Sequence, residues 1–121
     1  MLFRSKFPIL GVCLGMQAIA LYSGAEIYNL KQVKHGVSEN IIIQEASVLF
    51  EGLPEKFHVG LYHSWAVRTV PGCAFGVTAV NKDGVVMAIE DTRNKLFGVQ
   101  FHPESILTDH GKIILKNFLQ T

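Results

Sequence analysis

Short apolar runs, separated by glycine, proline and charged residues, divide the chain into strand-like and helix-like segments. Residues 7–12 form the first run and predict a buried strand, and residues 14–23 predict a helix that ends near Gly24. At the other end, residues 109–119 place isoleucine, leucine and phenylalanine on one broad face. This pattern predicts an amphipathic helix that packs on a sheet, with Thr108 as its N-cap.

The middle of the chain is rich in predicted strands. They cover residues 25–30, 39–45, 58–67, 74–81, 85–91 and 96–101, with a helical turn at 47–53. The turn signal at residues 34–36 predicts a loop between the first two strands, and polar residues at 62–65 interrupt the third. A second turn signal at residues 82–84 predicts an antiparallel hairpin over residues 74–91.

The composition fits one compact domain. The chain has 121 residues, of which 49% are hydrophobic and 17% charged, enough for a single core. Its net charge of +1 and its lack of a basic cluster argue against a nucleic-acid partner. No uninterrupted apolar run has the length of a membrane span. Cys13 and Cys73 show no metal-ligand spacing and make a poor disulfide framework, so we expect a reducing, cytoplasmic setting.

The segment around Cys13 has the spacing of a nucleophile elbow. Gly11 and Gly15 stand two residues before and after the cysteine, and a strand that turns sharply into a helix needs small residues there. In such an elbow Cys13 adopts a positive φ at the helix N-terminus, where unpaired amides lower the pKa of a thiol. Gln17 lies one helical turn further on the same face, so we expect it to line the pocket that Cys13 faces.

Two other interpretations of this segment stay open from its residues alone. A single cysteine in an apolar run is most often a small buried hydrophobic residue. The basic first residues, the apolar stretch to Tyr22 and the small residues at 23–25 also resemble a signal peptide. Pro8 and Gln17 interrupt the apolar stretch and argue against that second alternative.

A histidine and a carboxylate follow the last predicted strand. His102 and Glu104 are two residues apart, so an extended backbone places both side chains on the same side, and Pro103 favours that backbone. The pair suits a general base and the group that orients it: Glu104 accepts from one imidazole nitrogen, and the other nitrogen takes a thiol proton. His63 is the alternative base for Cys13, but no carboxylate stands two residues from it.

Together these segments resemble the class I (triad) glutamine amidotransferase family. The matching blocks are Gly11-Val12-Cys13-Leu14-Gly15-Met16-Gln17 and Gly98-Val99-Gln100-Phe101-His102-Pro103-Glu104-Ser105. Tyr62-His63-Ser64 further resembles a segment of the small subunits of anthranilate synthase and aminodeoxychorismate synthase. The resemblance implies one glutamine amidotransferase domain over residues 1–121, with an α/β, flavodoxin-like fold in which helices flank a mostly parallel sheet. Three blocks in the expected order also argue against a signal peptide.

The resemblance implies that the protein hydrolyses glutamine. Cys13 would attack the side-chain amide, His102 would take the thiol proton and later protonate the departing ammonia, and Glu104 would hold the imidazole. The substrate-binding residues that it implies are Leu14, Gly15, Gln17, His63 and Ser64. Among them, Leu14 would donate its backbone N–H to the oxyanion. No metal or cofactor is implied, and the ammonia would pass to the large, chorismate-binding subunit of a synthase.

One departure from the family pattern concerns the start of the chain. Relatives carry further residues before the elbow strand, including a Gly-Pro-Gly-type loop with a second oxyanion donor, so the chain resembles only the C-terminal two-thirds of such a domain. Because losing one donor costs about 10²–10³ in rate, we expect the chain alone to be impaired and poorly soluble. The alternatives are the amidotransferase domain of a carbamoyl-phosphate, GMP or CTP synthase, and a non-catalytic module that binds a synthase.

Overall fold

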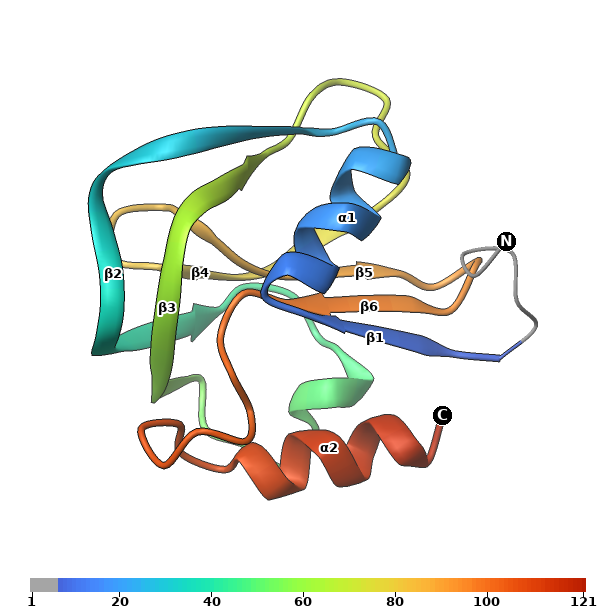
Figure 1. Ribbon diagram of the computed structural model, residues 1–121. Coiled ribbons are helices and arrows are strands. Elements are labelled where there is room, and N and C mark those ends of the chain that lie inside the picture. The colour runs from blue at the N-terminus through green and yellow to red at the C-terminus, as the bar shows by residue number, and fades with distance from the viewer. Residues whose placement is uncertain (1–6) are drawn as a thin grey trace.

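The computed structural model describes residues 7–121 (Figure 1). Its elements in chain order are β1 (Ile9–Val12), α1 (Leu14–Tyr22), β2 (Glu26–Ile43), η2 (Val48–Phe50), β3 (Lys56–Arg68), β4 (Gly76–Asn81), β5 (Val86–Asp91), β6 (Leu96–Val99) and α2 (Gly111–Leu119). The strands form a six-stranded sheet in the order β1-β6-β5-β4-β2-β3. Figure 1 shows α1 and α2 on opposite sides of this sheet, which confirms the α/β class and the flanking helices.

The sheet is mixed, which corrects the expectation of a mostly parallel one. Within the described residues, β1 and β6 pair in parallel, whereas every other neighbouring pair of strands is antiparallel. The reason is the length of the connections, since parallel neighbours need a crossover of about a dozen residues or more. Short turns at residues 82–85 and 92–95 instead reverse the chain between β4, β5 and β6. The hairpin predicted over residues 74–91 is confirmed as β4 and β5.

The long ribbon of β2 and β3 differs from the sequence prediction. Residues 34–36 do not form a loop, because β2 runs through them and pairs with β3 over most of its length. In place of a loop, the pairing of β2 with β3 shifts register on both sides of residues 34–35, and Gly36 has a φ of 69°. The polar residues at 62–65 likewise lie inside the continuous strand β3. Figure 1 shows this ribbon curling away from the plane of β1, β5 and β6.

Each helix covers its own hydrophobic cluster. Met16 and Ile19 of α1 pack with strand residues on one face of the sheet, and Ile114 of α2 packs on the other. Successive residues of β1 serve the two clusters, Ile9 on the α1 side and Leu10 on the α2 side. Because β1 and β6 are parallel and in register, the carboxyl ends of both strands lie at the same end of the sheet. Cys13 follows β1 at that end and His102 follows β6, so the topology brings the two predicted catalytic segments together.

The start of α2 also differs from the prediction. The helix begins at Gly111 with His110 as its N-cap, and Thr108 does not cap it. The hydroxyl of Thr108 is used elsewhere, in hydrogen bonds with the backbone of Gly60 and His102. The buried face of α2 is narrower than expected, because Leu119 is 80% exposed. Among the helices of residues 7–121, none is both long and apolar enough to span a bilayer.

Candidate active site

Cys13 occupies the sharp turn between β1 and α1. Its φ of 57° and ψ of −103° confirm the predicted positive φ, and its N–H donates to the carbonyl of Val99 at 2.8 Å. Gly11 is required sterically, since a Cβ there would lie 2.5 Å from the backbone carbon of Gly15. A Cβ on Gly15 would meet no atom within 4 Å among the described residues. The steric need for a small residue therefore holds before the cysteine and not after it.

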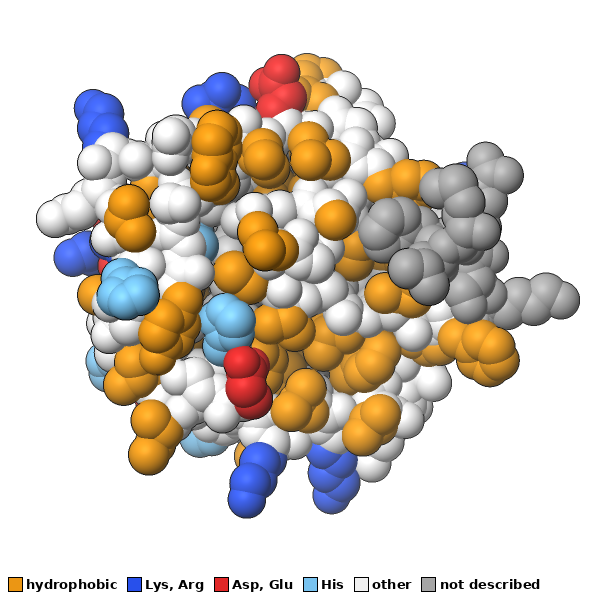
Figure 2. Space-filling model, in the orientation of Figure 1, with side chains coloured by type: hydrophobic (Ala, Val, Ile, Leu, Met, Phe, Trp, Pro, Cys, Tyr) orange, Lys and Arg blue, Asp and Glu red, His pale blue; other side chains and the backbone are white. Residues whose placement is uncertain are grey.

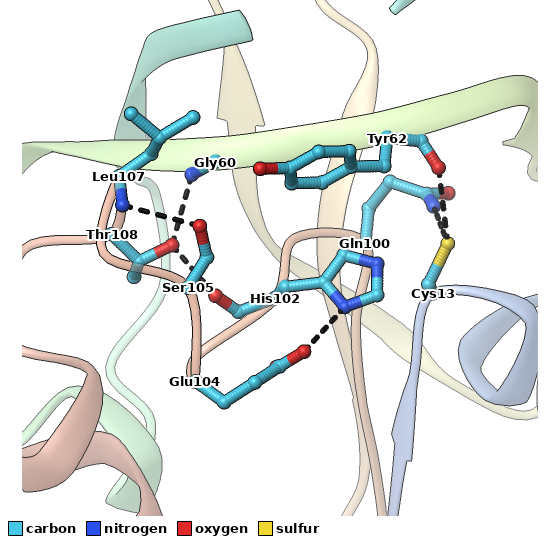
Figure 3. A network of polar contacts seen from close by, with 9 residues as sticks. All are labelled: Cys13, Gly60, Tyr62, Gln100, His102, Glu104, Ser105, Leu107 and Thr108. Atoms are coloured by element: carbon cyan, nitrogen blue, oxygen red, sulfur yellow. Dashed lines mark hydrogen bonds and ion pairs between the residues drawn. The ribbon is translucent and has the colours of Figure 1, made fainter. Parts of the chain in front are cut away.

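The thiol of Cys13 lies in a hydrogen-bonded, mostly buried position (Figure 3). It donates to the carbonyl of Tyr62 at 3.6 Å, and the side-chain amide of Gln100 donates to the sulfur at 3.6 Å. Burial raises the pKa of the Cys13 thiol above its ordinary value, and the backbone N–H of Leu14 and the Gln100 amide oppose this only in part. The expectation of a lowered pKa is therefore wrong for the resting protein, because desolvation outweighs the helix terminus.

His102 and Glu104 form the pair that the sequence predicts. The imidazole Nδ1 and the carboxylate Oε2 are 2.8 Å apart. Partial burial raises the pKa of Glu104. Its own backbone N–H and the bond to His102 lower the pKa by more, so the net pKa is below the ordinary value. The ring of Tyr62 packs edge-on against the imidazole, with 5.4 Å between centroids and an interplanar angle of 89°. Figure 3 shows the imidazole between the Glu104 carboxylate and the Cys13 side of the site.

Hydrogen bonds from backbone groups and the Thr108 hydroxyl hold the loop that carries His102 against β3. The N–H of His102 donates to the carbonyl of Gly60 at 3.2 Å, and its carbonyl accepts from the Thr108 hydroxyl at 2.7 Å. The same hydroxyl accepts from the N–H of Gly60 at 2.9 Å. A Cβ on Gly60 would lie 2.9 Å from the side chain of Ser105, so β3 can approach the loop only with glycine there. Sequence reasoning predicted neither contact, because it assigned Thr108 to the N-cap of the last helix and Gly60 lies in no recognisable motif.

Cys13 and His102 line one pocket of about 390 Å³. The other lining residues are Val12, Leu14, Gln17, Tyr62, His63, Ser64 and Trp65. Of the predicted site residues, Glu104 and Gly15 are not lining residues of this pocket, and the rest line it. A larger hollow of about 560 Å³ runs along β2 and shares only His63 with this pocket. That hollow contains neither cysteine, so the predicted chemistry belongs to the smaller pocket.

Two buried glutamines are hydrogen-bonded to each other beside Cys13. The Nε2 of Gln17 donates to the carbonyl of Trp65 at 2.9 Å and to the Oε1 of Gln100 at 3.2 Å. Gln100 has no exposed surface, and it was not among the predicted site residues. Its signal in the sequence is a polar residue at the end of an otherwise apolar strand, directly before Phe101 and His102. Gln17 lines the pocket of Cys13, as predicted.

His63 is buried and uses one ring nitrogen within the protein. Its Nδ1 bonds to the carbonyl of Trp65 at 2.7 Å, so Nδ1 carries the proton, and Nε2 is the acceptor. Among the described residues, this Nε2 is the one buried side-chain nitrogen or oxygen without a hydrogen-bond partner. Burial lowers the pKa of His63, and the bond to Trp65 opposes this only in part. The ring is therefore neutral, with a buried lone pair on Nε2 that no described residue hydrogen-bonds.

Acid should destabilise the fold through His63. The unfolded chain takes up a proton near the ordinary pKa of 6.5, whereas the folded chain resists protonation to a lower pH. The stability is therefore full above about pH 6.5 and falls as the pH drops from there towards the lower pKa of the folded state. Urea unfolding at pH 7.5 and pH 5.5 should show a smaller loss of stability on acidification in His63→Gln than in the wild type. Equal losses in the two proteins would contradict the assignment of a neutral buried ring.

Known proteins resemble this chain over most of its length. A family model described as glutamine amidotransferase class-I matches residues 1–121. The chain is 43% identical over 121 residues to aminodeoxychorismate/anthranilate synthase component 2 of Bacillus subtilis, covering 98% of this chain and 61% of that protein. It is 39% identical over 117 residues to the glutamine-hydrolyzing GMP synthase of Elusimicrobium minutum, covering 97% of this chain and 23% of that protein.

A solved structure has the same fold. The crystal structure of a protein from Thermoplasma acidophilum, described as a GMP synthase subunit, matches with a TM-score of 0.87 and 29% identity, covering 96% of this chain and 57% of that one. The chain therefore spans about three-fifths of the length of its stand-alone relatives. Within the described residues, no three His, Cys, Asp or Glu side chains gather as a metal site would require.

Proposed function

This chain belongs to the class I glutamine amidotransferase family, and we propose that its Cys13 pocket hydrolyses the side-chain amide of glutamine. The observation that carries the proposal is that Cys13, on its elbow, and His102, bonded to Glu104, line the same pocket. A cysteine nucleophile, a histidine base and a carboxylate that orients the base make up the nucleophile–base–orienter arrangement of covalent acyl transfer.

The reaction begins from the protonated thiol that burial favours. His102 accepts the proton of Cys13 on the ring nitrogen that faces away from Glu104. Glu104 accepts from Nδ1 at 2.8 Å, which fixes the ring orientation and stabilises the imidazolium once it forms. The raised pKa of the thiol is then an advantage, because the thiolate forms only when substrate and base are both in place.

The thiolate attacks the amide carbon of glutamine and forms a tetrahedral oxyanion. The N–H of Leu14, at the first turn of α1, is the candidate donor to that oxygen. When the intermediate collapses, the C–N bond breaks and the nitrogen leaves as ammonia with the proton from His102. A glutamyl thioester stays on Cys13, and water hydrolyses it to glutamate and restores the thiol.

Three further pocket residues fit the rest of the substrate. The unpartnered Nε2 of His63 is an acceptor, which suits an N–H of the substrate amide or its α-ammonium group. The amide nitrogen of Gln17 donates to Trp65 and Gln100, so the side-chain carbonyl oxygen of Gln17 is the atom that can accept a hydrogen bond from the substrate. Ser64 lies on β3 at the pocket wall, where its hydroxyl can serve either the carboxylate or the ammonium group.

We propose that the ammonia passes to a partner, the large subunit of a chorismate-using synthase. The similarity to component 2 of an aminodeoxychorismate/anthranilate synthase and the Tyr62-His63-Ser64 segment favour this partner. GMP synthase is the second candidate, because a relative of that name is 39% identical. Large apolar side chains at the mouth of the pocket, Leu14, Tyr62 and Trp65, are exposed. Figure 2 shows hydrophobic side chains over this face, as a docking surface requires.

Labelling with a glutamine analogue tests the proposed activity. The diazoketone 6-diazo-5-oxo-L-norleucine should modify Cys13 and leave Cys73 largely unmodified, and glutamine should protect Cys13. Cys73 bonds only weakly, at 3.8 Å, to the carbonyl of Phe75 and is not a lining residue of the pocket. Mass spectrometry of peptides after digestion measures both sites. The matched control is the asparagine analogue 5-diazo-4-oxo-L-norvaline, which is one methylene shorter. Equal labelling of both cysteines, or equal labelling by both reagents, would contradict a glutamine site at Cys13.

A further inference from the structure

We propose that Gln100 is a further catalytic residue, whose side-chain N–H donates to the Cys13 sulfur and stabilises the thiolate. This role rests on the proposed glutaminase function and extends it beyond the cysteine, histidine and glutamate. Gln100 follows β6 directly, and its backbone N–H donates to the carbonyl of Met87 at 2.8 Å. The side chain is completely buried, and its Nε2 lies 3.6 Å from the sulfur (Figure 3).

The orientation of the Gln100 amide follows from its neighbours. An amide can be placed in two ways, and the hydrogen-bond network decides between them. The carbonyl of Trp65 can only accept, so the nitrogen of Gln17 must face it, at 2.9 Å. The same nitrogen then donates to Gln100 at 3.2 Å, which requires the oxygen of Gln100 on that side. The nitrogen of Gln100 is thereby turned towards the sulfur, so a backbone carbonyl of β3 sets the polarity of both amides.

The Gln100 contact gains strength when the thiol loses its proton. A neutral thiol is a weak acceptor, whereas a thiolate is a full charge in a mostly buried site, where hydrogen bonds to ions are about twice as strong as neutral ones. The carbonyl of Tyr62, which accepts from the thiol at 3.6 Å, has no hydrogen to accept after ionisation. The thiolate then needs hydrogen-bond donors, and the side-chain N–H of Gln100 is one of them. An interaction stronger in the reacting state than in the resting state accelerates the reaction.

The pKa of Cys13 is consistent with this geometry. The Gln100 amide lowers the pKa of the thiol, against the larger effect of burial, which raises it. Gln100→Met removes the donor and nearly conserves the side-chain volume. The thiolate should then form less readily, while His102 and Glu104 keep their contact.

The test measures alkylation of Cys13 by iodoacetamide between pH 6 and pH 10, in a Cys73→Ser background so that Cys13 alone reports. In Gln100→Met the apparent pKa of Cys13 should rise by about one unit, and the rate at pH 7.5 should fall about tenfold. No glutamine is present, so a shifted profile supports the Gln100 role even if glutamine hydrolysis is never observed. An unshifted profile in a variant that melts cooperatively would overturn the role.

A second variant keeps the test decisive if Gln100→Met does not fold. Gln100→Glu has nearly the same shape and keeps an oxygen for Gln17, but it replaces the donor with an acceptor. Its ionised form would repel the thiolate, so its upward shift should exceed that of Gln100→Met. A purely structural role would lower the melting temperature and leave the alkylation profile unchanged. Under the proposed function, kcat for glutamine hydrolysis should fall by a similar factor with little change in KM.

Discussion

Replacing Gly11 with alanine should destroy the Cys13 site, whereas the same change at Gly15 should leave it intact. A Cβ on Gly11 would lie 2.5 Å and 2.6 Å from the backbone carbon and oxygen of Gly15, and 2.8 Å from the side chain of Ile19. Because two of the obstructing atoms are backbone, α1 must move away from β1. We expect a loss of about 3 kcal/mol of stability, the upper end for overpacking.

Gly15 is the matched control, because it carries the same change in the same segment. A Cβ there would meet nothing within 4 Å among the described residues, and alanine favours a helix over glycine by up to about 1 kcal/mol. Thermal unfolding gives the stability of both variants, and labelling of Cys13 by the glutamine analogue reports the geometry of the elbow. Gly11→Ala should lose labelling and melt earlier, and Gly15→Ala should keep both properties. Similar behaviour of the two variants would show that the close approach of α1 to β1 does not position Cys13.

The local geometry of the site could be predicted from the sequence because short spacings control it. The glycine before Cys13 indicates the elbow, and the observed φ of 57° agrees. The spacing of His102 and Glu104 likewise indicates their bond, which the structure has at 2.8 Å. Each of these features depends on a few neighbouring residues and on backbone geometry that holds in any fold.

Features that depend on distant partners could not be predicted in the same way. The turn signal at residues 34–36 indicates a loop, but pairing with β3 carries the strand through it. Thr108 is a good N-cap residue by type, but the approach of β3 at Gly60 gives its hydroxyl two other partners. Gln100 is aimed at the sulfur by Gln17, which is 83 residues away in the chain. None of these outcomes has a local signature.

The sign of the pKa shift at Cys13 illustrates the same limit. The helix N-terminus is visible in the sequence and predicts a lowered pKa. Burial is a property of the whole fold and acts in the opposite direction, and it is the larger effect here. A sequence can thus locate a nucleophile while giving the wrong ionisation state for it at rest.

Replacing His102 with alanine should abolish glutamine hydrolysis, and replacing His63 should not. The ring of His102 is bonded to the Glu104 carboxylate at 2.8 Å, and His102 lines the pocket with Cys13. Removing a general base costs about 10²–10⁴ in rate, and here the same residue also protonates the leaving ammonia. We therefore expect kcat to fall by about 10⁴ in His102→Ala, at the upper end of that range.

His63→Ala removes a substrate contact and leaves the base in place. Its Nε2 is a neutral acceptor that faces no partner among the described residues, so its loss weakens binding by about one hydrogen bond. That amounts to a KM about tenfold higher, with kcat reduced only modestly. Glutamate release measured over a range of glutamine concentrations separates the two parameters, and circular dichroism verifies that both variants are folded. A larger fall in kcat for His63→Ala than for His102→Ala would make His63 the base and would leave the His102–Glu104 pair with a structural role.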